Sequence, residues 1–239
     1  MTRPTTMATY VRRDEPAGAE LPFLVWRFAR PMRVVSSAPV GGGLGTRSWI
    51  LNAQVRAGYD RVDLHDHVAT LARLAGVPDD LEGIGLLTAA NVTAGFEASD
   101  GGVDVRSSVG INVAVWAAAP PEAATDAPFG APRPPGTINI VAVLPVALGD
   151  AALVNLATTA TEAKAQAMFD AGLAGTGTVT DAVAIACPTI DAAGSVEPFG
   201  GPRSRLGAPL ARAVHTSVLA GIRHSEAVIG RDRDAGARR

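Results

Sequence analysis

Apolar and β-branched residues recur in short runs along most of the chain, a pattern that predicts β-strands. The strongest run, Thr137 to Leu144, reads TINIVAVL and predicts a buried strand. The tripeptide at 100–102, Asp-Gly-Gly, separates two of the runs and predicts a hairpin turn. The strands expected on this basis span residues 21–30, 33–37, 49–55, 84–88, 92–98, 103–109, 137–144 and 178–186.

Three other segments carry apolar residues at helical spacing. We expect the first helix to run from a capping Asp63 to about Ala75 and the third from 209 to about 223. The second is the strongest, and we expect Asp150 to cap it and Ala171 to end it. Because strands and helices interleave and no internal repeat is visible, the sequence predicts an α/β fold: a single layered domain with a mixed β-sheet and flanking helices.

Both ends of the chain and one internal segment fall outside this pattern. Residues 1–20 contain no apolar run of signal-peptide length, and we expect a flexible N-terminal segment there. Residues 120–136 hold six prolines and predict a surface loop. Residues 230–239 form a charged tail that we expect to be mobile. These assignments leave residues 21–229 as one domain.

Composition narrows the classes of function. The chain has 239 residues, 47% of them hydrophobic, and a formal net charge of -2, so it can bury a core and lacks the basic excess of a nucleic-acid-binding protein. No stretch approaches about 18 consecutive apolar residues, so we expect no membrane span. The single cysteine, Cys187, cannot form an internal disulfide, which favours a cytoplasmic location. The oligomeric state is left open.

One charged residue stands out because it is the only lysine in the sequence. Lys164 projects from the middle of the apolar stripe of the 150–171 helix, whereas Glu162 belongs to the polar stripe opposite. An unpaired buried ammonium costs several kcal/mol, so Lys164 needs a partner. Our favoured candidate is Asp181, which we place early in the strand that follows. Lys164 is then either a structural lysine or an amine poised at a cleft for acid–base chemistry.

Two glycine-rich loops add further candidates. The loop that contains Gly41, Gly42 and Gly43 lacks the Gly-Lys-Ser/Thr of a phosphate-binding loop. It is either a wide turn or a bare stretch of backbone that lies against a flat ligand. The second loop, 174–178, joins the helix of Lys164 to the strand of Asp181 and predicts one edge of a site.

Two asparagines and the histidines complete the set of polar candidates. Asn52 and Asn139 lie within apolar runs, where each is either a satisfied core amide or a hydrogen-bonding clamp for a ligand. His65 and His67 would point about 200° apart on a helix and could not share an ion. We therefore expect no metal site in the protein.

Six short segments, taken in order, resemble one known family. They are SSAPVGGG at 36–43, LNAQV at 51–55, LTAA at 87–90, PGTINI at 135–140, ATEAKAQA at 160–167 and GTGTVTDA at 175–182. Over roughly residues 33 to 225 their order and spacing resemble the adenosylcobinamide amidohydrolases. The resemblance implies hydrolysis of the amide between the propionyl arm of a corrin ring and 1-amino-2-propanol, a step of cobalamin salvage. The substrate would then be a corrinoid, its cobalt would belong to the substrate, and the protein would need no cofactor of its own.

The resemblance also suggests roles for the candidate residues. Acid–base chemistry would fall to Lys164, Glu162 and Asp181, and the candidate hydroxyl nucleophiles are Thr88, Thr176 and Thr178. Substrate binding would fall to Gly41, Gly42, Gly43, Asn52, Asn139 and Thr176. Attack by an activated water and attack by a threonine both stay open. So do two other functions: a corrinoid-binding protein without turnover, and an amidase or acyltransferase for another bulky amide.

Overall fold

The computed structural model describes residues 5–14, 18–120, 136–190 and 197–236, which form one mixed eight-stranded sheet and three helices. The strands are β1 (Thr5–Asp14), β2 (Ala19–Ser36), β3 (Gly43–Gln54), β4 (Gly83–Thr88), β5 (Phe96–Asp100), β6 (Val103–Ile111), β7 (Gly136–Val143) and β8 (Ala182–Pro188). The helices are α1 (Leu64–Leu74), α2 (Asp150–Asp170) and α3 (Gly207–Gly236). The predicted α/β class is confirmed.

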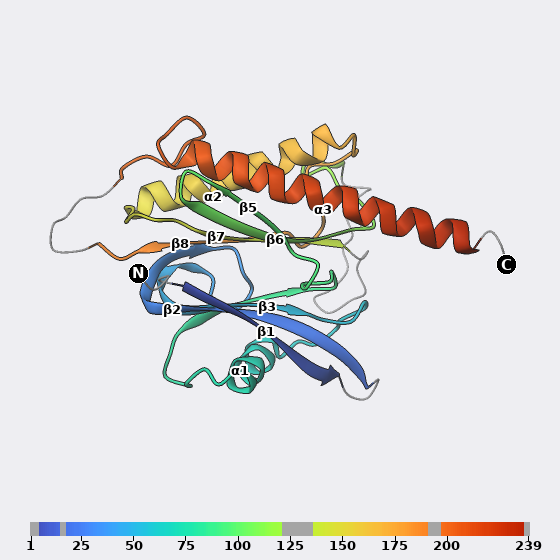
Figure 1. The fold of residues 1–239 in the computed structure, drawn as a ribbon, viewed down its shortest axis with the longest axis horizontal. Coiled ribbons are helices and arrows are strands. Elements are labelled where there is room, and N and C mark those ends of the chain that lie inside the picture. Colours follow the sequence, from blue (N-terminus) through green and yellow to red (C-terminus); the bar gives the residue numbers. More distant parts are fainter. Residues whose placement is uncertain (1–4, 15–17, 121–135, 191–196, 237–239) are drawn as a thin grey trace.

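The long strand β2 divides the sheet into two halves. Its first part pairs with β1 and its last part, Met32–Ser36, pairs with β8, while β3 runs along its other edge. The pairing with β3 shifts register between Arg27 and Met32, where Pro31 removes a backbone donor. The sheet order is therefore β4-β3-β2-β8-β7-β6-β5, and the β1–β4 half lies face to face with the β5–β8 half (Figure 1).

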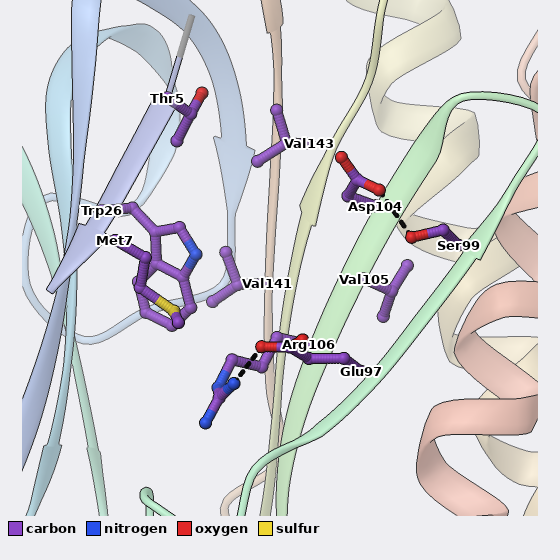
Figure 2. Close-up of a pocket in the computed structure, with 10 residues that line it drawn as sticks. All are labelled: Thr5, Met7, Trp26, Glu97, Ser99, Asp104, Val105, Arg106, Val141 and Val143. Atoms are coloured by element: carbon purple, nitrogen blue, oxygen red, sulfur yellow. Dashed lines mark hydrogen bonds and ion pairs between the residues drawn. The ribbon is translucent and has the colours of Figure 1, made fainter. Parts of the chain in front are cut away.

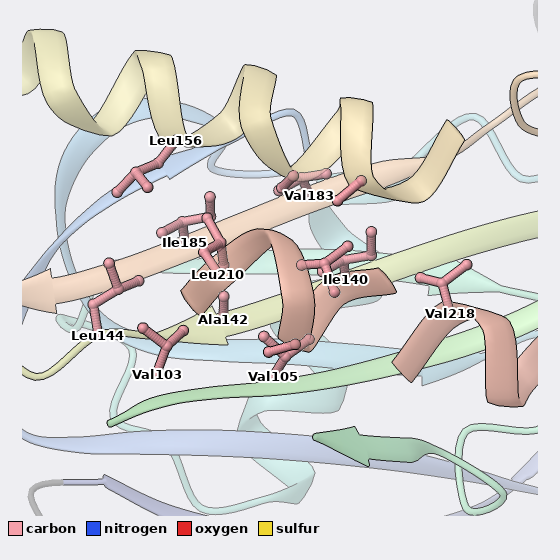
Figure 3. Close-up of a cluster of buried hydrophobic side chains, with 14 of the residues drawn as sticks. Val103, Val105, Ile140, Ala142, Leu144, Leu156, Val183, Ile185, Leu210 and Val218 are labelled. Carbon is pink, nitrogen blue, oxygen red and sulfur yellow. The ribbon is translucent and has the colours of Figure 1, made fainter. Parts of the chain in front are cut away.

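Helices cover the outer face of each half, so the molecule has four layers, α/β/β/α (Figure 1). Helix α1 packs on the β1–β4 half through residues such as Leu71, and α2 and α3 pack on the β5–β8 half. In that second interface Leu156 of α2 and Leu210 of α3 meet Ile140 and Ile185 of the sheet (Figure 3). Each buried strand thus presents one set of alternate residues to helices.

The other set of alternate residues faces the space between the two halves, which we refer to as the inter-sheet layer. Trp26 of β2 and Ile50 of β3 meet Val141 of β7 and Ala184 of β8 there. Because β7 and β8 bury both faces, their sequences read as continuous apolar runs rather than as alternating ones.

The N-terminal segment is more ordered than its sequence indicates. Residues 5–14 form β1, which pairs with β2 in antiparallel register, and Tyr10 stacks on Phe23 with ring centroids 5.3 Å apart. The prediction of a flexible segment over residues 1–20 is therefore wrong for β1. Backbone pairing along an existing strand supplies the stability that the weak apolar pattern of this segment does not indicate.

Several other boundaries differ from the predicted ones. Helix α3 continues to Gly236, so the tail expected to be mobile from residue 230 is helical over 230–236. Strand β3 begins at Gly43 rather than at 49, and β8 begins at Ala182 rather than at 178. The two runs predicted at 21–30 and 33–37 form one bent strand. Strand β5 begins at Phe96 rather than at 92. Most of the proline-rich loop predicted at 120–136 lies outside the described residues.

Neither aspartate expected to cap a helix does so with its side chain, because an arginine binds each carboxylate instead. Asp150 accepts two hydrogen bonds from Arg33 of β2, at 2.9 and 2.8 Å, and Gly149 is the N-cap residue of α2. Asp63 binds Arg61, and this hydrogen bond lowers the pKa of Asp63 to about 2. The Asp150 pair ties the start of α2 to the sheet.

Candidate active site

Asp181 lies in the turn that precedes β8. Its carboxylate accepts hydrogen bonds from four donors, which belong to α2, β7 and the turn itself. Its Oδ2 lies 2.5 Å from Nζ of Lys164 and 3.0 Å from the backbone nitrogen of Thr178. Its Oδ1 lies 2.5 Å from Oγ1 of Thr178 and 3.0 Å from the backbone nitrogen of Ile138. A carboxylate has about four acceptor positions, so all are occupied. We refer to Lys164, Gly177, Thr178, Asp181 and the N–H of Ile138 as the Asp181 cluster.

Lys164 reaches this carboxylate from the buried side of α2. The residue is only 7% exposed and projects between buried small and apolar side chains such as Ala160 and Met168. The prediction that Asp181 is its partner is confirmed by the contact. Asp181 lies just before β8, which begins at Ala182, and not within the strand as expected. The carboxylate also ties the turn to the sheet, because Asp181 accepts the backbone N–H of Thr178 in the turn and that of Ile138 in β7.

Gly177 is a member of the cluster that the sequence did not single out. A Cβ at this position would collide with both Oδ2 of Asp181 and Nζ of Lys164. The ion pair therefore lies directly against bare backbone, and any side chain at this position would displace Asp181 or Lys164. The signal in the sequence is the alternation of glycine and threonine over residues 175–178, which is typical of backbone packed closely against polar groups.

The segment after β6 lies beside the cluster. The nitrogen of Val115 donates to the carbonyl of Gly177 at 2.9 Å, and the nitrogen of Thr176 donates to the carbonyl of Val115 at 2.8 Å. Oγ1 of Thr176 accepts from the nitrogen of Ala117 at 3.1 Å. Trp116, between these two anchors, is 55% exposed. Thr176 thus holds a strand-like loop that carries an exposed aromatic ring next to the Asp181 cluster.

A second buried polar group lies in the inter-sheet layer. Nδ2 of Asn52 donates to Oγ of Ser108 at 3.0 Å, and Nδ2 of Asn139 donates to Oδ1 of Asn52 at 2.9 Å and to the carbonyl of Leu87 at 3.3 Å. Oδ1 of Asn139 is buried and has no hydrogen-bond partner. We refer to Asn52, Ser108 and Asn139 as the asparagine cluster.

Strand β7 joins the two clusters, because neighbouring residues of a strand serve opposite faces. The nitrogen of Ile138 belongs to the Asp181 cluster, and the side chain of Asn139 belongs to the asparagine cluster. Thr88, at the end of β4, is buried, and its Oγ1 accepts from the nitrogen of Ala90 at 3.0 Å. Within the described part of the chain, no hydrogen bond joins Thr88 to the Asp181 cluster.

The remaining predicted site residues lie elsewhere. Glu162 is exposed and, two positions from Lys164, projects from the other side of α2. Gly41, Gly42 and Gly43 form the turn between β2 and β3. Gly41 has a φ of +68°, a Cβ there would collide with the carbonyl of Gly83, and its own carbonyl accepts from Arg47 at 2.8 and 3.0 Å. The structure therefore accounts for these glycines as a tight turn packed against β4.

Within the described residues, Cys187 does not provide a reactive thiol, and the acidic residues do not provide a metal site. Cys187 is fully buried in β8, and burial raises the pKa of its thiol to about 11. Over residues 5–14, 18–120, 136–190 and 197–236, no three His, Cys, Asp or Glu side chains gather as metal ligands would. No helix formed by those residues is long and apolar enough to cross a membrane.

The Asp181 cluster places an amine, a carboxylate and a hydroxyl in mutual contact at the edge of a four-layered α/β fold. These are the groups that acid–base and nucleophilic catalysis require, so fold and site define an α/β protein equipped for such chemistry. The family model described as "Adenosylcobinamide amidohydrolase" matches residues 7–229, and the chain belongs to this family.

Two curated relatives bear the same name. The adenosylcobinamide amidohydrolase of Halobacterium salinarum is 33% identical over 159 residues, which cover 66% of this chain and 66% of the relative, just under two thirds of its length. That of Methanosarcina mazei is 28% identical over 192 residues, which cover 78% of this chain and 88% of the relative. The family predicted from the six sequence segments is therefore confirmed.

Proposed function

We propose that this protein is an adenosylcobinamide amidohydrolase. It hydrolyses the amide that joins the propionyl arm of the corrin ring to 1-amino-2-propanol and releases adenosylcobyric acid. The family match over residues 7–229 carries the proposal, because it spans every residue of the Asp181 cluster and of the asparagine cluster. The two relatives named as adenosylcobinamide amidohydrolases agree with it.

The surroundings of the Asp181 cluster suit a corrinoid. A corrin ring is broad and largely apolar, and the exposed ring of Trp116 offers an apolar face for it beside Gly177. The proposal assigns the cobalt to the substrate and no cofactor to the protein. It places the reaction in the cytoplasm, which the single buried cysteine favours, and it requires no nucleic acid as a partner.

We assign the attacking oxygen to the hydroxyl of Thr178. Its Oγ1 already donates to Oδ1 of Asp181, so the carboxylate takes the proton as Oγ1 bonds to the amide carbon. The proton then passes to the leaving 1-amino-2-propanol as the C–N bond breaks, which leaves an ester on Thr178. Water hydrolyses the ester to the carboxylic acid and restores the hydroxyl. Lys164 holds the carboxylate in place and balances its charge throughout.

One observation favours a second candidate function, a corrinoid-binding protein without turnover. All four acceptor positions of Asp181 are occupied by protein donors, which also suits a carboxylate that only fixes the turn. The two functions differ in their products. The enzyme releases 1-amino-2-propanol, whereas the binding protein returns adenosylcobinamide unchanged.

The test is mass spectrometry of adenosylcobinamide incubated with the purified protein in water enriched in oxygen-18. We expect a product with one new carboxylate that carries one heavy oxygen, together with free 1-amino-2-propanol. An acyl adduct on the peptide that contains Thr178, trapped at early times, identifies the covalent route. Unchanged corrinoid in the presence of folded protein contradicts the proposed function.

Threonine variants separate the two routes. Thr178→Val removes the hydroxyl and should abolish turnover and the adduct, whereas Thr178→Ser should retain both. Thr180→Val is the matched control, because Thr180 is exposed and its hydroxyl bonds to Thr137 rather than to Asp181. If Thr178→Val turns over normally, the attacking oxygen is that of an activated water.

A further inference from the structure

A cavity of about 320 Å³ lies in the inter-sheet layer, away from the Asp181 cluster (Figure 2). Its walls come from both halves of the sheet: β1 and β2 on one side, β5, β6 and β7 on the other. Val141 and Val143 line it, whereas the Asp181 cluster touches β7 at Ile138 and on the opposite face. At about 3.3 Å per residue, the two sites are separated by roughly 10 to 17 Å along β7. The volume is in the range of small-molecule pockets.

One wall of the cavity presents a flat ring with an unused hydrogen-bond donor. Trp26 is 6% exposed, and its indole nitrogen faces the cavity in Figure 2. Within the described residues, this N–H has no hydrogen-bond partner. The indole N–H can only donate, so a ligand acceptor that reaches it adds a hydrogen bond. By contrast, Trp49 is 7% exposed, and its Nε1 donates to the carbonyl of Leu81 at 2.9 Å.

Other lining residues also have unused hydrogen-bonding capacity. Oγ1 of Thr5 and Nε of Arg106 are buried without a partner. On the opposite wall Asp104 is exposed: its carboxylate accepts from Oγ of Ser99 at 2.6 Å through one oxygen, and its second oxygen is open to a ligand or to solvent. The cavity therefore combines donors and an acceptor with an apolar floor.

The charges of the lining residues restrict the ligand. Arg106 is paired with Glu97, and Asp104 has no cationic partner in the described part of the chain, so the lining carries net negative charge. Such a site disfavours phosphate and carboxylate groups. A flat, uncharged ring system fits: ring nitrogens accept from the indole N–H, hydroxyl or amino groups donate to Asp104, and the ring face packs on Val141.

We propose that this cavity binds an uncharged nucleoside group. Adenosine has every required feature: a planar ring with acceptor nitrogens, donor amino and hydroxyl groups, and no charge. Two sources share this chemistry, the adenosyl group on the cobalt of the substrate and a free nucleoside. The first rests on the proposed function, and the second does not.

Calorimetric titration with adenosine tests the site. We expect saturable binding of one adenosine per chain, weakened about five-fold by Trp26→Phe, which removes the N–H and keeps an aromatic ring. Thr5→Val, a nearly isosteric change on the same wall of the cavity, should weaken binding to a similar degree. Trp49→Phe is the matched control and should bind adenosine as the wild type does. Circular dichroism establishes that each variant is folded.

Kinetics with two corrinoids distinguishes the sources. If the adenosyl group of the substrate occupies the cavity, Trp26→Phe raises the KM for adenosylcobinamide relative to that for cobinamide with cyanide on the cobalt, and Trp49→Phe leaves this ratio unchanged. If a free nucleoside occupies the cavity, Trp26→Phe still weakens the binding of adenosine about five-fold, but the ratio of the two KM values stays that of the wild type. The inference is overturned if adenosine does not bind at millimolar concentration and the KM ratio is unaffected. Binding of adenosine without hydrolysis of either corrinoid would contradict only the proposed function.

Discussion

Two groups of buried polar residues lie on opposite faces of β7 and differ in how fully they are satisfied. In the Asp181 cluster, every acceptor position of the carboxylate is occupied, one of them by the ammonium of Lys164. In the inter-sheet layer, Oδ1 of Asn139 and Oγ1 of Thr5 are buried and have no partner among the described residues. One region is saturated, and the other keeps spare hydrogen-bonding capacity.

The difference follows from charge. A buried ion without partners costs several kcal/mol, so Asp181 and Lys164 can be buried only as a complete group. A buried neutral amide or hydroxyl without a partner costs about 1–3 kcal/mol, which a fold of this size tolerates. Saturation therefore marks a preorganised charged centre, whereas unmet neutral groups mark places where a ligand can still bind.

The largest expected effect comes from breaking the saturated cluster. Asp181→Asn leaves Lys164 buried without a counter-charge and should lower the free energy of unfolding by about 3–5 kcal/mol, with loss of turnover. Lys164→Met should cost less, about 2 kcal/mol, because the carboxylate keeps three donors. Urea unfolding and turnover of adenosylcobinamide measure both.

The double variant sharpens the interpretation. Lys164→Met combined with Asp181→Asn should lose at least about 1 kcal/mol less than the sum of the single losses, because the two charges are coupled. Asp150→Asn is the control, since its pair with Arg33 is exposed and solvent screens the attraction between the two charges. Additive losses in the cycle would show that Lys164 and Asp181 act independently.

A smaller disturbance displaces the ion pair without removing it. Gly177→Ala introduces a Cβ against Asp181 and Lys164 and should lower turnover about 10²-fold by misplacing both groups. Gly172→Ala is the matched control: its φ is +76° and no atom lies within 4 Å of the added Cβ, so only backbone strain is expected. Equal turnover in the two variants would contradict a catalytic role for the cluster.

In the unsaturated region the expected effect is on stability. Asn139→Ala leaves Oδ1 of Asn52 and the carbonyl of Leu87 without their donor, and should lower the free energy of unfolding by about 2 kcal/mol. The exposed Asn155 supplies the control, where Asn155→Ala should change stability by no more than about 0.5 kcal/mol. If the two variants unfold alike, the asparagine cluster contributes nothing to the fold.

The smallest expected effect concerns Cys187, whose thiol is titratable but is buried in its neutral form within the apolar core. Burial raises the pKa of its thiol from 9.0 to about 11, so the unfolded chain ionises first. Its stabilising contribution is complete below pH 9 and is lost as the pH rises through 11. Thermal unfolding of wild type and Cys187→Ala across this range isolates the contribution, and parallel curves would contradict it.

Several features could be predicted from the sequence because they depend on local patterns. The apolar run at 137–144 and the helical spacing at 150–171 are strong local signals, and the structure has β7 and α2 there. The position of Lys164 in an apolar stripe required a buried carboxylate, and few candidates lay close enough in the chain. Six short segments sufficed to indicate the family.

Other features depend on partners far apart in the sequence and could not be predicted from it. The strand β1 forms because β2 offers an edge, and Asp150 leaves its capping role because Arg33, more than a hundred residues away, binds it. The meeting of Asn52 with Asn139 likewise depends on how the sheet folds back on itself.

The sequence by itself determined the α/β class, the family and the pairing of the one lysine, because each follows from local periodicity, segment order or the cost of a buried charge. The tertiary structure alone decided that Gly177 lies against the ion pair, that Asn52 meets Asn139, and that a cavity opens beside Trp26. Those outcomes depend on how the two halves of the sheet and the three helices pack. Packing brings together residues that are far apart in the chain, and no local sequence pattern indicates that they will meet.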